Sequence, residues 1–218
     1  MLNWCQPVFD KCLNMNLSKE YLNDASAIKS AEIILASQSP RRKQLLEWAE
    51  VPFEIVVKET DESFPPGLSP EDTAIHIARN KGLAVWQDRH FTRPVLSADT
   101  IVVLEKKIIG KPKDRQDAIA ILSALSGKKH RVITGVVILY KEKETAFADT
   151  TEVEFHELTN EQIVYYVDKY KPYDKAGAYA IQEWVGVTGI KSISGDFYNV
   201  MGLPISRVVQ ALGRLSND

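Results

Sequence analysis

Residues 95–104 read VLSADTIVVL, an almost continuous run of apolar, largely β-branched residues. Such a run predicts a buried central strand. Glu105 to Lys107 then predicts a turn that leads back into Ile108 and Ile109. One ionisable residue, Asp99, lies inside the run. A buried carboxylate is costly unless it is paired, metal-bound or hydrogen-bonded, so this residue needs a partner.

Upstream of this strand, the pattern predicts two further strands, each followed by a helix. Residues 33–36 (IILA) form a short apolar run typical of a buried strand. Ser39 as N-cap and Pro40 as first helical residue predict a helix directly after it. Residues 53–57 predict a second strand, and the pair Ser69-Pro70 opens the next helix.

Downstream, helices again alternate with strands. The sequence predicts a helix that is capped by Asp114 and ended by Gly127, followed by a hairpin of strands 131–140 and 147–155. It then predicts a helix with a Thr159/Gln162 capping box and a last helix that begins at Pro204. We therefore expect an α/β fold in which a mixed sheet with flanking helices forms two lobes around a cleft. Residues 31–218 are expected to form one domain, and residues 1–30 an N-terminal extension.

Charge and composition exclude several classes of partner. The chain of 218 residues carries 27 Lys and Arg against 29 Asp and Glu, a net charge of −2, so no general attraction to nucleic acid or to an acidic membrane is expected. The first 30 residues lack the apolar stretch of an export signal, and no later run is long enough to span a membrane. Cys5 and Cys12 suit neither a disulfide framework nor a zinc site. These features predict a cytoplasmic protein.

Three cations stand where a helix would repel them. Arg41, Arg42 and Lys43 occupy the first turn of the predicted helix, whose free N–H groups already carry partial positive charge. A phosphate bound there by the N–H groups, the hydroxyls of Ser37 and Ser39 and an arginine fork would reverse the sign of this interaction. A solvated basic face is the alternative interpretation.

Asp99 and two lysines also allow two interpretations each. Asp99 could bind a metal or accept a proton from water, or it could belong to a structural network with Ser97 and Thr100. Lys81 falls on an apolar helical stripe, from which lysines commonly extend to solvent. Lys111, between Gly110 and Pro112, is a cation on a rigid backbone.

Familiar catalytic motifs are absent from the sequence. It contains no G-x-x-x-x-G-K-[ST] phosphate loop, no dinucleotide fingerprint and no G-x-S-x-G nucleophile elbow. The histidines are scattered without ligand spacing, at His76, His90, His130 and His156. These absences argue against an ATPase, a dehydrogenase and a serine or zinc hydrolase.

Six separated blocks of sequence resemble those of one family, in order and with compatible spacing. They are residues 37–42 (SQSPRR), 97–100 (SADT), 110–112 (GKP), 130–136 (HRVITGV), 174–182 (DKAGAYAIQ) and 195–204 (GDFYNVMGLP). Together they resemble the Maf family of nucleoside triphosphate pyrophosphatases, over residues 33 to about 212.

The resemblance implies an elongated fold related to the inosine triphosphate pyrophosphatases, a divalent metal such as Mg²⁺ or Mn²⁺, and a homodimer. It implies hydrolysis of a nucleoside triphosphate to the monophosphate and pyrophosphate. By position, Asp99 resembles the family's proton acceptor and a metal ligand, with Glu62 as second metal ligand. The resemblance further assigns base specificity to Arg41, Thr100 and Gln182, and phosphate contacts to Arg42, Lys81 and Lys111.

The segment AGAYAIQ, residues 176–182, resembles the subgroup that acts on dTTP and UTP. This resemblance implies a housekeeping role in the nucleotide pool, with modified pyrimidine nucleotides as further substrates. Two alternatives remain at this point. One is a metal-dependent phosphomonoesterase built on Asp99, and the other is a nucleotide-binding regulator of cell division without significant catalysis.

Overall fold

The computed structural model describes residues 32–87 and 92–215, so the expected N-terminal extension lies outside the described residues. The strands are β1 (Ile33–Leu35), β2 (Phe53–Ile55), β3 (Val95–Leu104), β4 (Lys107–Ile109), β5 (Lys129–Tyr140), β6 (Lys143–Phe155) and β7 (Ile190–Ser194). The helices are α3 (Pro40–Trp48), α4 (Pro70–Trp86), α5 (Arg115–Leu125), α6 (Asn160–Tyr170), the 3-10 turn η1 (Ala176–Ala178), α7 (Trp184–Gly189), α8 (Phe197–Met201) and α9 (Ile205–Leu215).

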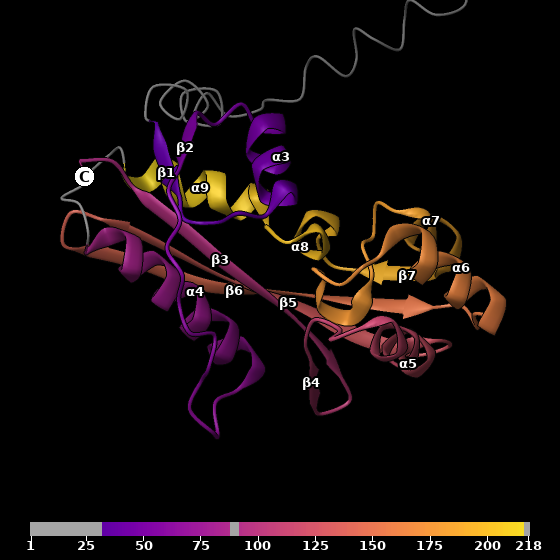
Figure 1. Ribbon diagram of the computed structural model, residues 1–218. Helices are drawn as coiled ribbons and strands as arrows, with labels where there is room; N and C mark the ends of the chain where they lie inside the picture. The colour runs from indigo at the N-terminus through magenta and orange to yellow at the C-terminus, as the bar shows by residue number, and fades with distance from the viewer. Residues whose placement is uncertain (1–31, 88–91, 216–218) are drawn as a thin grey trace, which may run out of the picture.

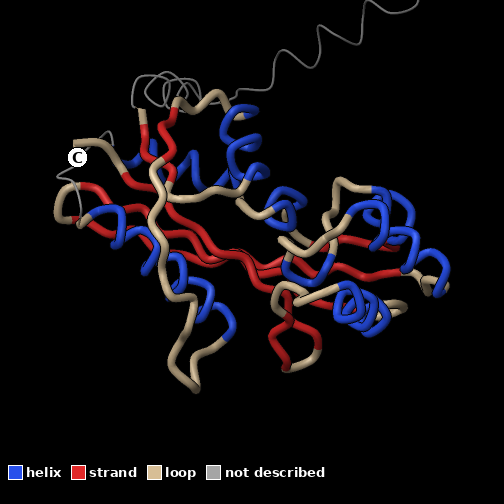
Figure 2. Tube along the Cα trace, in the orientation of Figure 1, coloured by secondary structure: helices blue, strands red, loops and turns tan. Residues whose placement is uncertain are grey.

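These strands form one mixed sheet that runs the length of the molecule. Within the described ranges its order is β2-β1-β3-β5-β6-β7, with β4 paired to the end of β3. The β1 pairings are parallel, and β3, β5 and β6 pair antiparallel. Figures 1 and 2 show β1, β2, α3, α4 and α9 gathered at one end of the long strands, and α5, α6, α7 and β7 at the other. The predicted α/β fold, with a mixed sheet and two lobes, is confirmed.

Side-chain caps begin several of the helices as the sequence predicts. The hydroxyl of Ser69 accepts from the N–H of Asp72 at 3.0 Å, and the carboxylate of Asp114 accepts from the N–H of Asp117 at 2.9 Å. The Thr159/Gln162 capping box is also present. Ser39 stands at the N-cap of α3, but its side chain makes no capping hydrogen bond. No helix among the described residues has the length and apolarity to span a membrane.

Alternate residues of β3 face opposite sides of the sheet, because side chains alternate along a strand. Leu96 and Ala98 pack in a core with α3 and α9. Val95 packs in a second core with Ala78 and Val85 of α4. Asp99 therefore faces α4, and the next residue, Thr100, faces α3.

One edge of β3 is left open in its middle. Strand β1 pairs only with Val95 and Leu96, and β4 pairs only with Val102 to Leu104. Across residues 32–87 and 92–215, no strand pairs with this edge between Ser97 and Ile101. Side chains on both faces of β3 can thus be reached from one opening between the lobes.

A glycine brings helix α4 unusually close to the sheet. Gly135 of β5 lies opposite Asp99 in the β3–β5 register. A Cβ atom at this position would lie 2.3 Å from the backbone carbon of Ala74 and 2.4 Å from the backbone nitrogen of Ile75. The missing side chain lets α4 lie directly on β5, which carries Lys81 toward Asp99.

The boundaries and the late segment differ from the prediction. The strand expected over residues 53–57 ends at Ile55, and β6 begins at Lys143 rather than at residue 147. The glycine-rich stretch 174–202, for which no element was predicted, contains η1, α7, β7 and α8. Strand β7 (IKSIS) is an edge strand whose residues are largely exposed, so it lacks the regular apolar alternation that reveals half-buried strands.

Candidate active site

A cavity of about 650 Å³ opens at the free edge of β3. Its walls come from the start of α3, the loop before α4, α4 itself, the segment around η1, and α8. It brings together the predicted site residues Ser37, Ser39, Arg41, Arg42, Glu62, Lys81, Asp99, Thr100 and Lys111. Segments far apart in the sequence therefore form one polar cavity of the size that holds small-molecule ligands.

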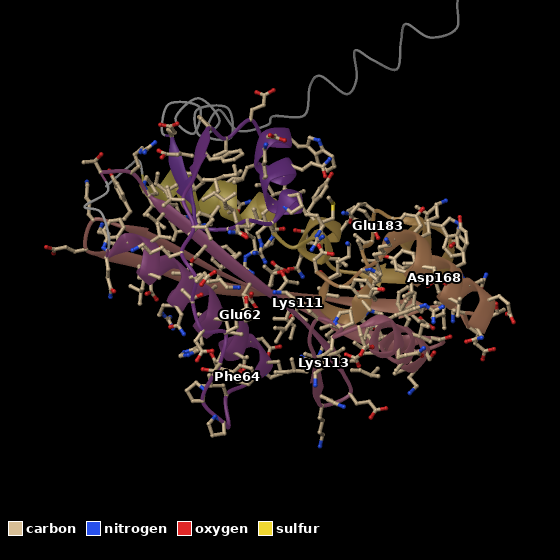
Figure 3. The ribbon with its side chains drawn as sticks, viewed as in Figure 1. Glu62, Phe64, Lys111, Lys113, Asp168 and Glu183 are labelled. Atoms are coloured by element: carbon tan, nitrogen blue, oxygen red, sulfur yellow. The ribbon has the colours of Figure 1, made fainter. Side chains whose placement is uncertain are left out.

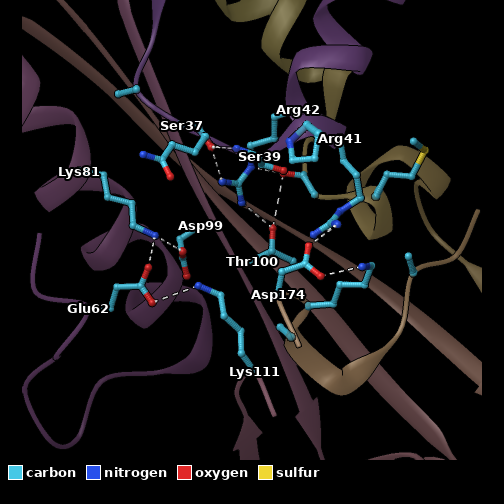
Figure 4. Close-up of a pocket in the computed structure, with 18 of the residues that line it drawn as sticks. Ser37, Ser39, Arg41, Arg42, Glu62, Lys81, Asp99, Thr100, Lys111 and Asp174 are labelled. Carbon is cyan, nitrogen blue, oxygen red and sulfur yellow. Dashed lines mark hydrogen bonds and ion pairs between the residues drawn. The ribbon is translucent and has the colours of Figure 1, made fainter. Parts of the chain in front are cut away.

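Two carboxylates and two lysines form an ion-pair chain on one side of this cavity (Figure 4). Lys81 Nζ donates to Asp99 Oδ1 at 2.6 Å and lies 2.7 Å from Glu62 Oε1. Lys111 Nζ lies 3.5 Å from Glu62 Oε2. The side chains of Lys81 and Asp99 are only 19% and 13% exposed, so limited contact with water strengthens their attraction.

The contacts of Lys81 and Ser97 distinguish between the interpretations of Lys81 and Asp99. Lys81 does not extend to solvent; it binds Asp99 and Glu62. The hydroxyl of Ser97 donates to the carbonyl of Val137, so it is not the partner of Asp99. Partial burial alone would raise the pKa of Glu62, but the hydrogen bond and charge of Lys81 and the charge of Lys111 hold that pKa below its usual value.

Arg42 is the buried cation at the bottom of the cavity. Its Nε donates to the carbonyl of Gly202 at 2.8 Å, Nη1 to Ser37 Oγ at 3.0 Å, and Nη2 to Thr100 Oγ1 at 3.1 Å. Burial lowers the pKa of Arg42, although the charge of Asp99 opposes this. A guanidinium has five N–H donors, so two remain for a ligand.

A second charged cluster lies on the other side of the cavity. Arg41 Nη1 lies 3.2 Å from Asp174 Oδ2, and Lys175 Nζ donates to Asp174 Oδ1 at 2.7 Å. The side chains of Arg41 and Lys175 are 21% and 10% exposed. Figure 4 shows Asp174 and Arg41 across the cavity from Glu62 and Lys111. Lys43, the third cation of the helix start, is exposed and pairs with Glu47 at 3.6 Å.

The segment 174–182 contributes differently from the prediction. Gln182 is exposed and is not among the residues that line the cavity. Asp174, Lys175 and Tyr179 line it instead, although only Gln182 was assigned a role from the sequence. The adjacent opposite charges of Asp174 and Lys175, shortly before Gly177, could have indicated this site, but such pairs are common on protein surfaces. The role of Gln182 stays a prediction.

Behind Tyr179, a buried histidine makes the fold sensitive to acid. His130 Nε2 lies 2.8 Å from the Tyr179 hydroxyl, and burial lowers the pKa of His130 to about 4. Between pH 6.5 and about 4 the unfolded chain binds a proton that the folded protein does not bind. Stability therefore falls as the pH falls through this window, by about 3 kcal/mol from this group.

We expect His130→Gln to flatten the pH dependence of the free energy of unfolding between pH 6.5 and 4, because glutamine does not titrate. Urea unfolding at several pH values measures this slope. The matched control is His156→Gln at an exposed histidine, which should keep the slope of the wild type. An unchanged slope in His130→Gln would contradict the assignment.

Comparison with known protein families identifies the family of this chain. The family model described as Maf-like protein matches residues 32–215. The chain belongs to the Maf-like protein family. The family predicted from the six sequence blocks is thereby confirmed.

Proteins named dTTP/UTP pyrophosphatase align with most of the chain. A Bacillus cereus protein named dTTP/UTP pyrophosphatase is 49% identical over 187 residues, which are 86% of this chain and 97% of the relative. A Cytophaga hutchinsonii protein of the same name is 46% identical and covers 87% of both chains. Among solved structures, the Staphylococcus aureus Ham1 protein aligns at 13% identity over 57% of this chain and 71% of its own, with a TM-score of 0.40.

The carboxylates of this Maf-like protein suit a metal shared with a ligand. Residues 32–87 and 92–215 contain no group of three or more His, Cys, Asp or Glu that could hold a metal alone. Asp99 and Glu62 nevertheless converge on the same ammonium group. Mg²⁺ commonly uses one or two carboxylates, water and substrate phosphates, so this donor set fits a divalent cation bound together with a phosphorylated ligand.

Proposed function

We propose that this Maf-like protein hydrolyses dTTP and UTP to the nucleoside monophosphate and pyrophosphate. The names of relatives that are 43–49% identical over most of the chain support this activity. The observation that carries the proposal is the Asp99–Lys81–Glu62 ion-pair chain, of which Lys81 and Asp99 are largely shielded from water, in a cavity that also holds Arg41, Arg42 and Lys111. Fixed positive charge beside a carboxylate is the combination that hydrolysis of a phosphoric anhydride requires.

The cations of the cavity would hold the triphosphate. Lys81 and Lys111 present ammonium groups, and Arg42 has two N–H donors left for phosphate oxygens. The start of α3, with Ser37 and Ser39, adds backbone and hydroxyl donors where the helix favours an anion. These groups neutralise the triphosphate and stabilise the charge that develops on the departing pyrophosphate.

Asp99 would accept the proton of the attacking water. Lys81 fixes its Oδ1, while Oδ2 has no hydrogen-bond partner in the described part of the chain. Water oxygen forms a bond to the α-phosphorus as its proton passes to Asp99, and the bond from the α-phosphorus to the bridging oxygen breaks. Pyrophosphate leaves with that electron pair, and the monophosphate remains.

We further propose that Asp99 and Glu62 hold Mg²⁺ or Mn²⁺ together with phosphate oxygens. When bound, the ion supplies charge neutralisation and lowers the pKa of bound water. Arg41, Thr100 and Gln182 remain the proposed determinants of base specificity. We also propose that the protein acts in the cytoplasm, in housekeeping of the nucleotide pool. A homodimer is proposed as well, and light scattering of the purified protein tests it.

A metal-dependent substrate panel tests the reaction. With Mg²⁺ or Mn²⁺, we expect UTP and dTTP to yield equimolar monophosphate and pyrophosphate, faster than ATP or GTP; chromatography measures both products. Orthophosphate without monophosphate would favour a phosphomonoesterase. Nucleotide binding without turnover would favour the regulator of cell division. Tenfold faster release of pyrophosphate from a purine triphosphate would contradict the assigned specificity.

A further inference from the structure

Arg41, Asp174 and Lys175 form a cluster in which a hydrogen-bond acceptor, the Asp174 carboxylate, lies between two hydrogen-bond donors, the Arg41 guanidinium and the Lys175 ammonium group. Asp174 lies between the two cations, with Oδ2 3.2 Å from Arg41 Nη1 and Oδ1 2.7 Å from Lys175 Nζ. The arrangement is held from behind, because Lys175 Nζ also lies 3.5 Å from Glu183 Oε1, and Glu183 accepts from the hydroxyl of Tyr166. All three members of the cluster line the cavity.

This order of groups matches one edge of a pyrimidine base. Uracil and thymine present O4, N3–H and O2 in a row, which are an acceptor, a donor and an acceptor. The row is the same in dTTP and UTP, which differ only at C5 of the base and C2′ of the sugar. A protein that reads this edge would accept both nucleotides without contacting either point of difference.

The cluster also stands in the right part of the cavity for a base. Lys81, Lys111 and Glu62 lie on one side, and Arg41 and Asp174 lie on the other (Figure 4). If the first side holds the triphosphate, the base extends toward the second. Apolar walls for its ring come from Tyr179, Val200 and Met201 of the same cavity.

We propose that Asp174 is a specificity-determining residue that accepts a hydrogen bond from N3–H of uracil or thymine, with Arg41 and Lys175 donating to O4 and O2. This inference rests on the proposed function. A carboxylate has about four acceptor sites, so Asp174 can keep both cations while it accepts from the base. Partial burial alone would raise the pKa of Asp174, but the hydrogen bonds and charges of Lys175 and Arg41 together hold that pKa below its usual value, so the carboxylate is an acceptor at neutral pH.

Cytosine would be rejected by the same groups. Its N3 is an acceptor and would face the Asp174 carboxylate, and its 4-amino group is a donor and would face a cation. A site built to hydrogen-bond a substrate N–H discriminates strongly against analogues that lack it. Because the Asp174 side chain is 57% exposed, water can replace part of the lost bonding, and we expect about tenfold to hundredfold discrimination.

The test compares kcat/KM for UTP and CTP in the wild type and in Asp174→Asn. The asparagine amide can donate to N3 of cytosine, so the UTP to CTP ratio should fall about tenfold or more. The wild type should also discriminate against 3-methyluridine triphosphate, which lacks N3–H. The matched control is Asp168→Asn on α6, where the carboxylate pairs with Arg115. Figure 3 shows Asp168 far from Glu62, a residue of the cavity, so this variant should keep the wild-type ratio of kcat/KM for UTP and CTP.

A purely structural role for Asp174 gives a different result. If Asp174 only anchors Arg41, the variant loses activity with UTP and CTP equally, and the unchanged ratio overturns the proposal. Equal hydrolysis of UTP and 3-methyluridine triphosphate by the wild type also overturns it. Should the wild type release no pyrophosphate from UTP or dTTP, the proposed function fails. Calorimetric binding of UTP and CTP to both proteins then tests the base recognition separately.

Discussion

Asp99→Asn should fold normally but lose about 10²–10⁴-fold in kcat with UTP, the range that a general base contributes. Asparagine keeps the shape of the side chain but cannot accept the proton of the attacking water. The fold should survive because Lys81 retains Glu62 at 2.7 Å, so no buried charge is left unpaired. Pyrophosphate release at saturating metal and UTP measures the effect.

The folded state of this variant needs its own measurement. Urea unfolding of Asp99→Asn should give a midpoint close to that of the wild type. Asp168→Asn serves again as the control, since it removes a carboxylate charge outside the cavity and should keep full turnover. Near-normal pyrophosphate release from metal-loaded Asp99→Asn would remove Asp99 from its proposed role.

Gly135→Ala should damage both stability and activity. The added Cβ would lie 2.3–2.5 Å from backbone atoms of Ala74 and Ile75, which cannot rotate away as a side chain can. Helix α4 must therefore move off β5, and overpacking of this kind costs about 1–3 kcal/mol or more. The movement carries Lys81 away from Asp99, so kcat with UTP should fall along with the urea midpoint.

A second glycine provides the control for stability. A Cβ at Gly110 would meet nothing within 4 Å, so Gly110→Ala should leave the urea midpoint unchanged. If Gly135→Ala unfolds at the wild-type midpoint and keeps wild-type turnover, the close approach of α4 does not hold the ion pair in place.

The sequence was most informative where a residue broke a local rule. Asp99 stood out as a charge within an apolar strand, and Arg41 and Arg42 as cations at a helix start. Asp99, Arg41 and Arg42 all line the cavity, whereas Lys43, the third cation of that helix start, is exposed and pairs with Glu47. The resemblance to the Maf family then supplied Glu62 and Lys111, whose local patterns alone did not decide their roles.

The contacts between these residues could not be read from the sequence. The Lys81–Asp99 pair depends on α4 packing on one face of β3, and the opening depends on β1 and β4 leaving the middle of that strand unpaired. Both are consequences of strand register and helix placement, which local patterns do not specify. Asp174 could not be singled out from the sequence because its contact is with Arg41, 133 positions away in the chain.

The hydrogen bond from Arg42 to Gly202 has a consequence for how the protein is made. These residues are 160 positions apart, and ribosomes release the amino-terminal partner first. Arg42 is therefore synthesised long before Val200, Met201 and Gly202, which form part of the cavity wall. The cavity is therefore complete only after the chain has been translated beyond α8, and under the proposed function we expect translation products that end before α8 not to bind nucleotides.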